Sequence, residues 1–207
     1  MALRFALLVF DGCDLLDVGG PYEVLLTANR LAERAGAAVP FEVLTVAPDD
    51  RPVAAYGGLG LRAAGLVDEV DRADVVVVPG LIDLDAALQD RPLLAAVSGL
   101  VSRSEVAASV CTGAFLLAEV GALAGRTVTT HHEDADLLAA RDDVGEVVTD
   151  RRWVDTGEVV TGAGLSSGLA LGLHLVDRFA GRDLALATAR QLEHPWDPDG
   201  RHEAVDA

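Results

Sequence analysis

The hydrophobic positions of this chain fall into short continuous runs, separated by longer segments with apolar residues at helical spacing. The apolar runs cover residues 4–10, 41–47, 74–80 and 105–109. The third run contains four consecutive valines, and a run without a polar position on either face is typical of a strand inside a parallel sheet. Further strands are expected at residues 127–130, 144–155 and 158–161.

The segments between these runs predict helices. The clearest is residues 166–179, where apolar residues recur every three or four positions. An earlier helix is expected to begin near Gly20-Pro21 and to end at Gly36, because proline is favoured in a first turn and glycine after a last one. Other helices are expected at residues 92–102, 113–120, 132–141 and 183–192, and the glycine-rich stretch 53–62 favours a small hairpin.

Strands that alternate with helices predict an α/β fold, a three-layer αβα sandwich with a mostly parallel sheet. We expect a single domain over residues 1–193 and an irregular tail over residues 194–207, which contains two prolines and a glycine. Ligands of such folds bind at the carboxyl ends of the strands. Three strand ends are expected at that edge, and they lead to Asp17, Gly80 and Cys111.

Composition narrows the function classes. The chain has 207 residues, 51% hydrophobic and 24% charged, with a net charge of -17, and all 16 of its basic residues are arginine. So acidic a chain is repelled by phosphate, which argues against nucleic-acid and membrane-surface partners. The absence of lysine excludes a lysine Schiff base and a P-loop lysine. No basic segment or helix-turn-helix follows the main body, so no DNA-reading module is expected.

The N-terminal residues, the apolar runs and the cysteines predict a cytoplasmic protein. The first ten residues lack the charge and cleavage pattern of a signal peptide, and no apolar run reaches the length of about 20 residues that a membrane span needs. Two cysteines, Cys13 and Cys111, do not make a disulfide framework, and unpaired thiols suit a reducing compartment.

Cys111 has the strongest chemical pattern in the chain. It follows a buried strand, precedes an apolar helix, and has small residues two positions before and after it, at Ser109 and Gly113. A nucleophile elbow needs this spacing because the tight turn leaves no room for bulk. The helix N-terminus would also stabilise a thiolate. A buried structural cysteine is the alternative, and the spacing alone leaves the two interpretations equally open.

Three blocks of the sequence, taken together, resemble the ThiJ/PfpI superfamily. They read FDGCDLLDVGGPYEVL from Phe10, VAASVCTGAFLLAEVGALAGRTVTTH from Val106, and VVTGAGLSSGLALGLHLV from Val159. The resemblance extends from Leu3 to about Leu192. It looks most like the branch that holds isocyanide hydratases and the sensing domains of AraC-type regulators, and it implies a flavodoxin-like, class I glutamine amidotransferase-like fold.

The resemblance implies the catalytic residues. Cys111 matches the nucleophile, and Asp17 matches the acidic partner. Thr112 matches the residue whose backbone N–H faces the substrate. The protease branch carries histidine at that position, so Thr112 argues against proteolysis.

The resemblance also implies a set of substrate-binding residues. Gly80 and Leu81 match the oxyanion loop, in which Leu81 replaces a glycine of the family pattern, so that the backbone there must suit a side chain. His131 matches a histidine near the cysteine. A pocket-lining loop matches Gly162, Ala163 and Gly164.

The implied reaction is hydration of a small isocyanide to an N-substituted formamide. A thiolate of Cys111 would attack the terminal carbon, and Asp17, sharing one proton with the thiol, would protonate that carbon and later activate water. No cofactor is expected, and a homodimer is. Two other functions stay open: a ligand or redox sensor without catalysis, and a glyoxalase or deglycase.

Each candidate residue also has a plainer interpretation. Asp17 could cap the helix that follows it. Cys13 is expected to be an exposed or half-buried thiol. Adjacent histidines 131 and 132 are expected to point apart, so no metal site is predicted. His174 is expected in the core or at an interface, and Trp196 and Tyr22 at the pocket or an interface.

Overall fold

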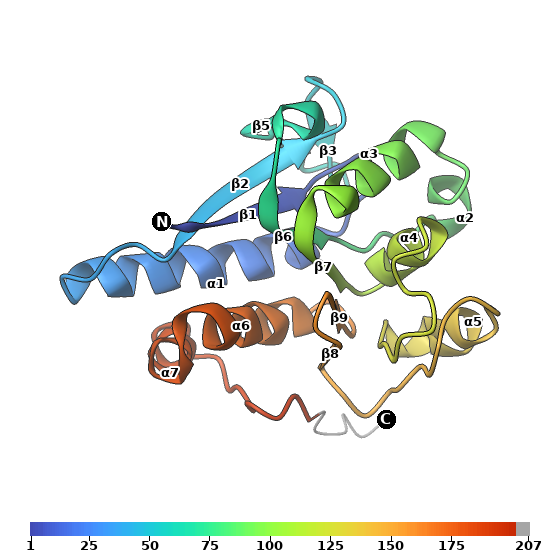
Figure 1. Cartoon of the computed structure of the whole chain (residues 1–207). Helices are drawn as coiled ribbons and strands as arrows, with labels where there is room; N and C mark the ends of the chain where they lie inside the picture. The colour runs from blue at the N-terminus through green and yellow to red at the C-terminus, as the bar shows by residue number, and fades with distance from the viewer. Residues whose placement is uncertain (202–207) are drawn as a thin grey trace.

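The apolar runs form the centre of a seven-stranded sheet in the computed structural model, which describes residues 1–201 (Figure 1). The strand order is β5-β2-β1-β6-β7-β9-β8, and β8 pairs antiparallel with β9 while the other pairs are parallel. The order reverses between β1 and β6, which is where ligands bind in folds of this kind. The strands are β1 Leu3–Leu8, β2 Phe41–Ala47, β5 Gly65–Leu66, β6 Ala73–Val78, β7 Ser104–Val110, β8 Trp153–Asp155 and β9 Val159–Gly162.

Helices cover both faces of this sheet, and the predicted three-layer αβα fold is confirmed (Figure 1). Three helices pack together on one face: α1 Leu15–Arg34, α6 Ser167–Ala180 and α7 Arg182–Gln191. The other face is covered by the 3-10 turn η1 Val67–Glu69, α3 Arg91–Ser102 and α4 Gly113–Glu119. Shorter elements are the hairpin β3 Val53–Ala54 with β4 Gly60–Leu61, α2 Leu84–Ala87, η2 His132–Asp134 and α5 Ala135–Ala139.

The core is densest where β1 and β6 lie side by side. Residues 5–8 and 75–76 are 0% exposed, because helices cover both faces of these strands. Phe5 makes edge-on contacts with Phe41 at 5.2 Å and with Phe179 at 6.1 Å, measured between ring centroids. Each fully buried aromatic of this kind contributes about 1.5–3 kcal/mol to stability. This packing fixes the strand ends that carry the candidate residues.

Helix α1 begins five residues earlier than the proline predicted. It starts at Leu15, so Pro21 lies inside the helix and Asp17 in its first turn. Close packing against α6 accommodates this arrangement: a Cβ added at Gly168 would lie 3.2 Å from the Pro21 ring, and one added at Gly20 would lie 3.3 Å from the Leu169 nitrogen. The interpretation of Asp17 as a helix cap is therefore wrong.

The segment between α4 and β8 is less regular than predicted. Within the described chain, residues 127–130 and 144–152 form isolated bridges, at Ala124–Val144 and Val128–Val147, instead of strands. The two segments meet so closely that a Cβ at Gly145 would lie 2.5 Å from the Arg126 carbonyl oxygen. The helix expected at 132–141 is divided into η2 and α5.

The chain after α7 is irregular but docked. Trp196 donates from Nε1 to the Ala170 carbonyl at 3.1 Å, so it packs on α6 of its own chain. The Arg152 N–H donates to the Gly200 carbonyl at 2.8 Å. Residues 202–207 of the expected tail lie outside the described residues, and the domain boundary at 193 stays a prediction. None of the helices within residues 1–201 has the length and apolar character that a membrane crossing requires.

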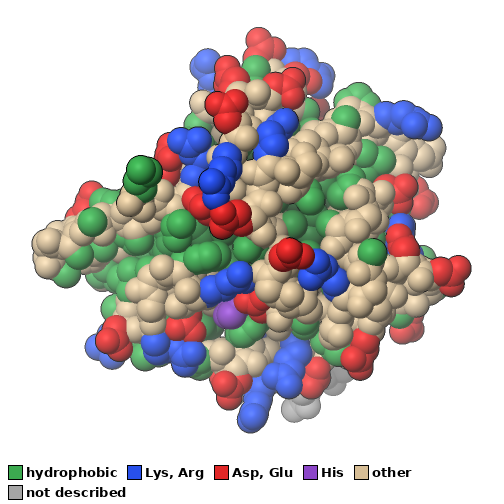
Figure 2. Space-filling model, in the orientation of Figure 1, with side chains coloured by type: hydrophobic (Ala, Val, Ile, Leu, Met, Phe, Trp, Pro, Cys, Tyr) green, Lys and Arg blue, Asp and Glu red, His purple; other side chains and the backbone are tan. Residues whose placement is uncertain are grey.

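Charge is distributed evenly on the face that Figure 2 shows, where acidic and basic side chains are interspersed. The structure contains ion pairs such as Arg4–Glu42 and Arg141–Asp143, both at 2.9 Å. Exposed pairs of this kind contribute about 0–1 kcal/mol each. The packing of the core, and not the surface charge, therefore determines the stability of the fold.

Gly113→Ala tests the tightest contact in the fold. An added Cβ would lie 2.4 Å from the Val78 carbonyl oxygen, so we expect a loss of at least about 2 kcal/mol in the free energy of unfolding. Gly99→Ala is the matched control, because its Cβ would meet only the flexible end of Arg103. It should stabilise the helix by about 0.5–1 kcal/mol. Urea unfolding of both variants measures the difference, and equal midpoints would contradict the prediction.

Candidate functional site

Cys111 occupies a sharp turn between β7 and α4. Its φ is 57°, a left-handed conformation that side chains other than glycine rarely adopt, at a cost of about 1–3 kcal/mol. Three hydrogen bonds hold the strained residue. Its N–H donates to the carbonyls of Gly162 at 3.1 Å and Ala163 at 2.9 Å, and its own carbonyl accepts from Thr130 Oγ1 at 2.8 Å. The nucleophile elbow that the sequence predicted is present in this geometry.

Two glycines allow neighbouring loops to approach the elbow. A Cβ at Gly80 would lie 2.7 Å from Asp17 Oδ2 and 2.8 Å from Cys111 Cβ. A Cβ at Gly113 would collide with the carbonyl of Val78. The end of β6 can therefore lie directly against Cys111 only because both positions lack a side chain. This contact brings three strand ends to one point, as the sequence predicted.

Asp17 lies beside the thiol as a buried carboxyl. It is 0% exposed, and Oδ2 accepts a hydrogen bond from the Gly80 N–H at 2.9 Å. Oδ1 is buried and has no hydrogen-bond partner among residues 1–201. Burial raises the pKa of Asp17 to about 7, the Gly80 N–H opposes that rise, and the charge of Asp14 adds to it. A carboxyl with such a pKa can both take and give a proton near neutrality.

Of the two groups, the Cys111 thiol has the higher pKa. The residue is 3% exposed, and burial, followed by the negative charge of Asp17, raises the pKa of Cys111 to about 12. The backbone N–H of Thr112 donates toward the sulfur and lowers that pKa. Burial and charge thus outweigh the N-terminus of the seven-residue helix α4. The resting pair is a neutral thiol next to a titrating carboxyl.

The Leu81 backbone does not provide the free oxyanion donor that the family pattern implied. Its N–H donates to Thr112 Oγ1 at 2.8 Å, and its carbonyl accepts from the same hydroxyl at 2.7 Å. The Gly80 N–H is used by Asp17. The loop is therefore fastened to the elbow, and the Thr112 N–H is left as the donor that faces the sulfur.

Asp14 also lies in the site, although the sequence did not single it out as a candidate residue. Single ligand atoms of Asp14, Asp17 and Cys111 lie within 4.8 Å of one another. Asp14 is 5% exposed, and burial raises its pKa while the charge of His131 lowers it. The spacing of 14 and 17 places both residues on one face of the helix start, which is the one pattern that could have revealed it.

The three groups are close enough to chelate a cation, but their protonation argues against that role. The pKa is raised at Asp14, Asp17 and Cys111 alike. A metal binds deprotonated ligands, so it would have to displace protons that burial makes hard to remove. We assign no metal to the cluster.

The remaining predicted residues surround the elbow in different ways. His131 packs on the pocket loop, where a Cβ at Gly164 would lie 2.8 Å from its ring, and its charge acts on Asp14. Gly162 and Ala163 act through the carbonyls that hold Cys111. The rings of His131 and His132 have centroids 4.5 Å apart, so the expectation that they point apart is wrong.

Two other sequence expectations concern residues outside the reacting cluster. Cys13 is 0% exposed, not exposed or half-buried, because its backbone pairs with Leu81 in a β-bridge beneath the hairpin loop. His174 is partly buried as expected. Its Nε2 lies 2.7 Å from Asp155 Oδ2, and its ring stacks on Trp153.

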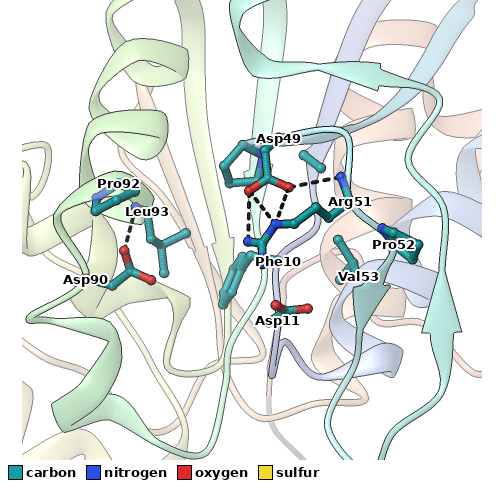
Figure 3. A pocket seen from close by; sticks show the side chains of 11 residues that line it. Phe10, Asp11, Asp49, Arg51, Pro52, Val53, Asp90, Pro92 and Leu93 are labelled. Atoms are coloured by element: carbon teal, nitrogen blue, oxygen red, sulfur yellow. Dashed lines mark hydrogen bonds and ion pairs between the residues drawn. The ribbon is translucent and has the colours of Figure 1, made fainter.

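Two clefts open at the carboxyl edge of β1 and share Phe10, Asp11, Asp90 and Leu93. The smaller one, of about 100 Å³, appears in Figure 3, where the Arg51 guanidinium is paired with Asp49. The larger one has about 410 Å³ and a mainly apolar wall. That wall includes Gly12, Tyr56, Leu81 and Ile82. Leu81 is the residue fastened to Thr112, so this cleft adjoins the elbow.

Comparison with known proteins agrees with this geometry. The model of the DJ-1/PfpI family matches residues 3–178. An isonitrile hydratase from Pseudomonas putida is 31% identical over 99% of this chain and 87% of its own length. The HTH-type transcriptional regulator CdhR of Pseudomonas aeruginosa is 27% identical over 93% of this chain, which spans 55% of the regulator.

Solved structures confirm the fold. A ThiJ/PfpI family protein from Pseudomonas syringae superimposes with a TM-score of 0.82 and 26% identity, over 100% of this chain and 80% of that one. Drosophila melanogaster DJ-1beta gives 0.77 and 18%, over 94% and 100%. An AraC family transcriptional regulator from Pseudomonas putida gives 0.72 and 23%, over 92% and 99%.

The buried Asp17 carboxyl predicts a stability that falls as pH rises. Its pKa of about 7 lies well above its unfolded value, so the folded chain holds a proton that the unfolded chain releases between pH 4 and 7. Above pH 7 the cost reaches about 4 kcal/mol. Asp17→Asn keeps an acceptor for Gly80 and removes this cost. It should therefore raise the free energy of unfolding at pH 8 and change it little at pH 4.5.

Urea unfolding at both pH values measures the effect. Asp85→Asn, which removes an exposed carboxylate from α2, is the control and should leave the pH dependence unchanged. A wild-type chain and an Asp17→Asn variant that lose stability in parallel from pH 4.5 to 8 would contradict the assignment.

Proposed function

This chain belongs to the DJ-1/PfpI family, and on that premise we propose that it hydrates a small isocyanide to an N-substituted formamide, as a cysteine-dependent hydro-lyase. The observation that carries the proposal is the buried pair of Cys111 and Asp17. The carboxyl has one oxygen fixed by Gly80 and a second that finds no partner within the described chain. The similarity to an isonitrile hydratase supports the same reaction.

The protonation states of Asp17 and Cys111 suit addition of the thiol to an isocyanide. Above pH 7 Asp17 is ionised while Cys111 keeps its proton, so Asp17 can accept that proton as the sulfur attacks the terminal carbon. The electron pair that forms on this carbon then takes the proton back from Asp17. The product is a thioimidate on Cys111. The Asp17 carboxyl acts first as a base toward the sulfur and then as an acid toward the neighbouring carbon.

Hydrolysis completes the reaction. Water adds to the thioimidate carbon, the nitrogen gains a proton, and the C–S bond breaks to release the formamide and the thiol. The Thr112 N–H, which faces the sulfur, is placed to stabilise negative charge there. The proposed steps use no cofactor. That the protein needs none stays a prediction.

The adjoining cleft favours an apolar substituent on the substrate. Its volume of about 410 Å³ falls in the range of small-molecule sites, and its wall is mainly apolar. An isocyanide has little polarity beyond its terminal carbon and nitrogen, so its substituent would be held by dispersion and hydrophobic contact. The proposed substrate class is therefore a small alkyl or aryl isocyanide.

Ligand sensing without catalysis is the second candidate, because the chain also resembles the regulator CdhR over most of its length. Redox sensing by Cys111 is disfavoured. Redox-sensing cysteines are accessible and have a low pKa, whereas Cys111 is buried with a raised pKa. A glyoxalase activity would show as lactate formation from methylglyoxal.

Turnover of cyclohexyl isocyanide tests the reaction. Wild-type protein should form the formamide, detected by mass spectrometry, and Cys111→Ala should abolish its formation. Cys13→Ala is the matched control, since it removes the other thiol, which lies in the core, and it should retain turnover. Formamide production by Cys111→Ala would exclude the covalent route. No turnover by the wild type would exclude the isocyanide, and ligand binding without reaction would then favour the sensor.

The expected homodimer is a separate prediction. Leu15, Leu16 and Ile82 flank the site and are 42%, 43% and 60% exposed, and a second copy would cover such large apolar side chains. Light scattering should give twice the mass of the chain, and Leu16→Asp should shift the mass toward that of one chain. A monomeric wild type would remove this prediction and leave the chemistry at Cys111 in place.

A further inference from the structure

The proposed reaction leaves one buried acid of the site without a role. Asp14 is 5% exposed, and its Oδ2 has no hydrogen-bond partner in the described part of the chain. Its backbone is fixed, because its N–H donates to the Gly80 carbonyl at 2.9 Å and its carbonyl accepts from the Asp17 N–H. The side chain is therefore held beside Asp17 and Cys111, within the 4.8 Å that separates their ligand atoms.

A structural role does not account for this carboxyl. Asp14 occupies the N-cap position of α1, where an aspartate normally accepts a hydrogen bond from the first turn. In the chain as described, its side chain makes no such bond. A buried acceptor without a partner destabilises the folded state, and more so when it is charged. A carboxyl kept in the core at that cost, with a carboxylate oxygen within 4.8 Å of the Cys111 sulfur, is typical of an acid–base group.

The chemistry of hydration needs a second such group. Asp17 has one oxygen bound to Gly80 and a single free oxygen, which serves the carbon in the addition step. Hydrolysis requires a proton to leave the water and another to reach the nitrogen, at positions different from the carbon. We propose that Asp14 is a second catalytic acid–base residue, which activates the water that hydrolyses the thioimidate. This inference rests on the proposed isocyanide hydration.

The proton transfers balance as follows in the hydrolytic step. The water oxygen bonds to the thioimidate carbon and gives one proton to the Asp14 carboxylate, while the C=N electron pair moves to nitrogen. The nitrogen then takes that proton from Asp14. The remaining hydroxyl proton passes to Asp17 as the C–S bond breaks, and Asp17 returns it to the departing sulfur. Both carboxylates and the thiol are regenerated.

The groups that face Asp14 keep the two acids distinct. Asp17 and Cys111 lie on one side, Cys13 is the preceding residue, and His131 lies toward the pocket loop. Burial raises the pKa of Asp14, and its interaction with His131 opposes that rise. Two carboxyls with different surroundings can divide the roles of acid and base, because their pKa values separate. In the proposed division Asp14 serves the water, while Asp17, which accepts the hydrogen bond from Gly80, exchanges its proton with the sulfur.

The test separates adduct formation from adduct hydrolysis. Wild type, Asp14→Asn, Asp17→Asn and the exposed control Asp85→Asn are mixed with cyclohexyl isocyanide, and samples are quenched in acid and weighed by intact-mass spectrometry. Asp14→Asn should form the Cys111 adduct as fast as the wild type and then accumulate it, with steady-state turnover reduced by about 100-fold or more. Asp17→Asn should form the adduct slowly and accumulate none. Asp85→Asn should match the wild type.

A pH profile distinguishes catalysis from a loss of structure. In Asp14→Asn, adduct formation should keep the acidic limb that the ionisation of Asp17 gives it, while adduct hydrolysis stays slow at every pH and the thermal midpoint does not fall. Wild-type turnover by Asp14→Asn without adduct accumulation would overturn the inference and leave the proposed function intact. An inactive wild type would overturn both.

Discussion

The strained turn at Cys111 is the constraint on which the site depends. A residue with a side chain is kept at φ 57° because β9 ends next to β7 and offers two carbonyls to its N–H, while Thr130 holds its carbonyl. The free energy for this strain comes from the buried sheet, whose central strands are covered on both faces. Since the turn aims the sulfur at the start of α1, the position of Asp17 follows from the same arrangement.

Close approach of the backbones brings the three strand ends together, and the side chains of Thr112 and Asp17 hold them there. The loop after β6 lies against the elbow because Gly80 and Gly113 have no Cβ, and Thr112 then fastens Leu81 through both of its backbone groups. This arrangement has a chemical consequence. The N–H groups of Gly80 and Leu81 are consumed by the protein, so positive potential near the sulfur comes mainly from Thr112. In the proposed addition the negative charge develops on the terminal carbon, where Asp17 delivers a proton, so this step needs less oxyanion stabilisation than acyl transfer does.

The sequence predicted the architecture well where hydrophobic burial decides it. The valine run of β6, the elbow after β7 and the helix α6 were visible because long apolar patterns have few alternatives. Local features that depend on tertiary contact were not visible. The start of α1 was misplaced because Pro21, expected in the first turn, lies inside the helix, where its ring packs closely on Gly168 of α6. The strands expected at 127–130 and 144–152 lack the neighbours that would extend their pairing beyond isolated bridges.

In the candidate site, too, some features are visible in the sequence and others depend on tertiary structure. Cys111 is indicated by its spacing and by the resemblance, and Asp17 by the resemblance alone. The proposed role of Asp14 depends on burial, which composition cannot reveal in a chain with 33 acidic residues. Burial also opposes the thiolate that the helix N-terminus was expected to stabilise, because it raises the pKa of Cys111 to about 12. A site that stored a thiolate would be exposed to oxidation between turnovers. A buried thiol that loses its proton only to an adjacent carboxylate remains unreactive until a substrate carbon reaches the sulfur.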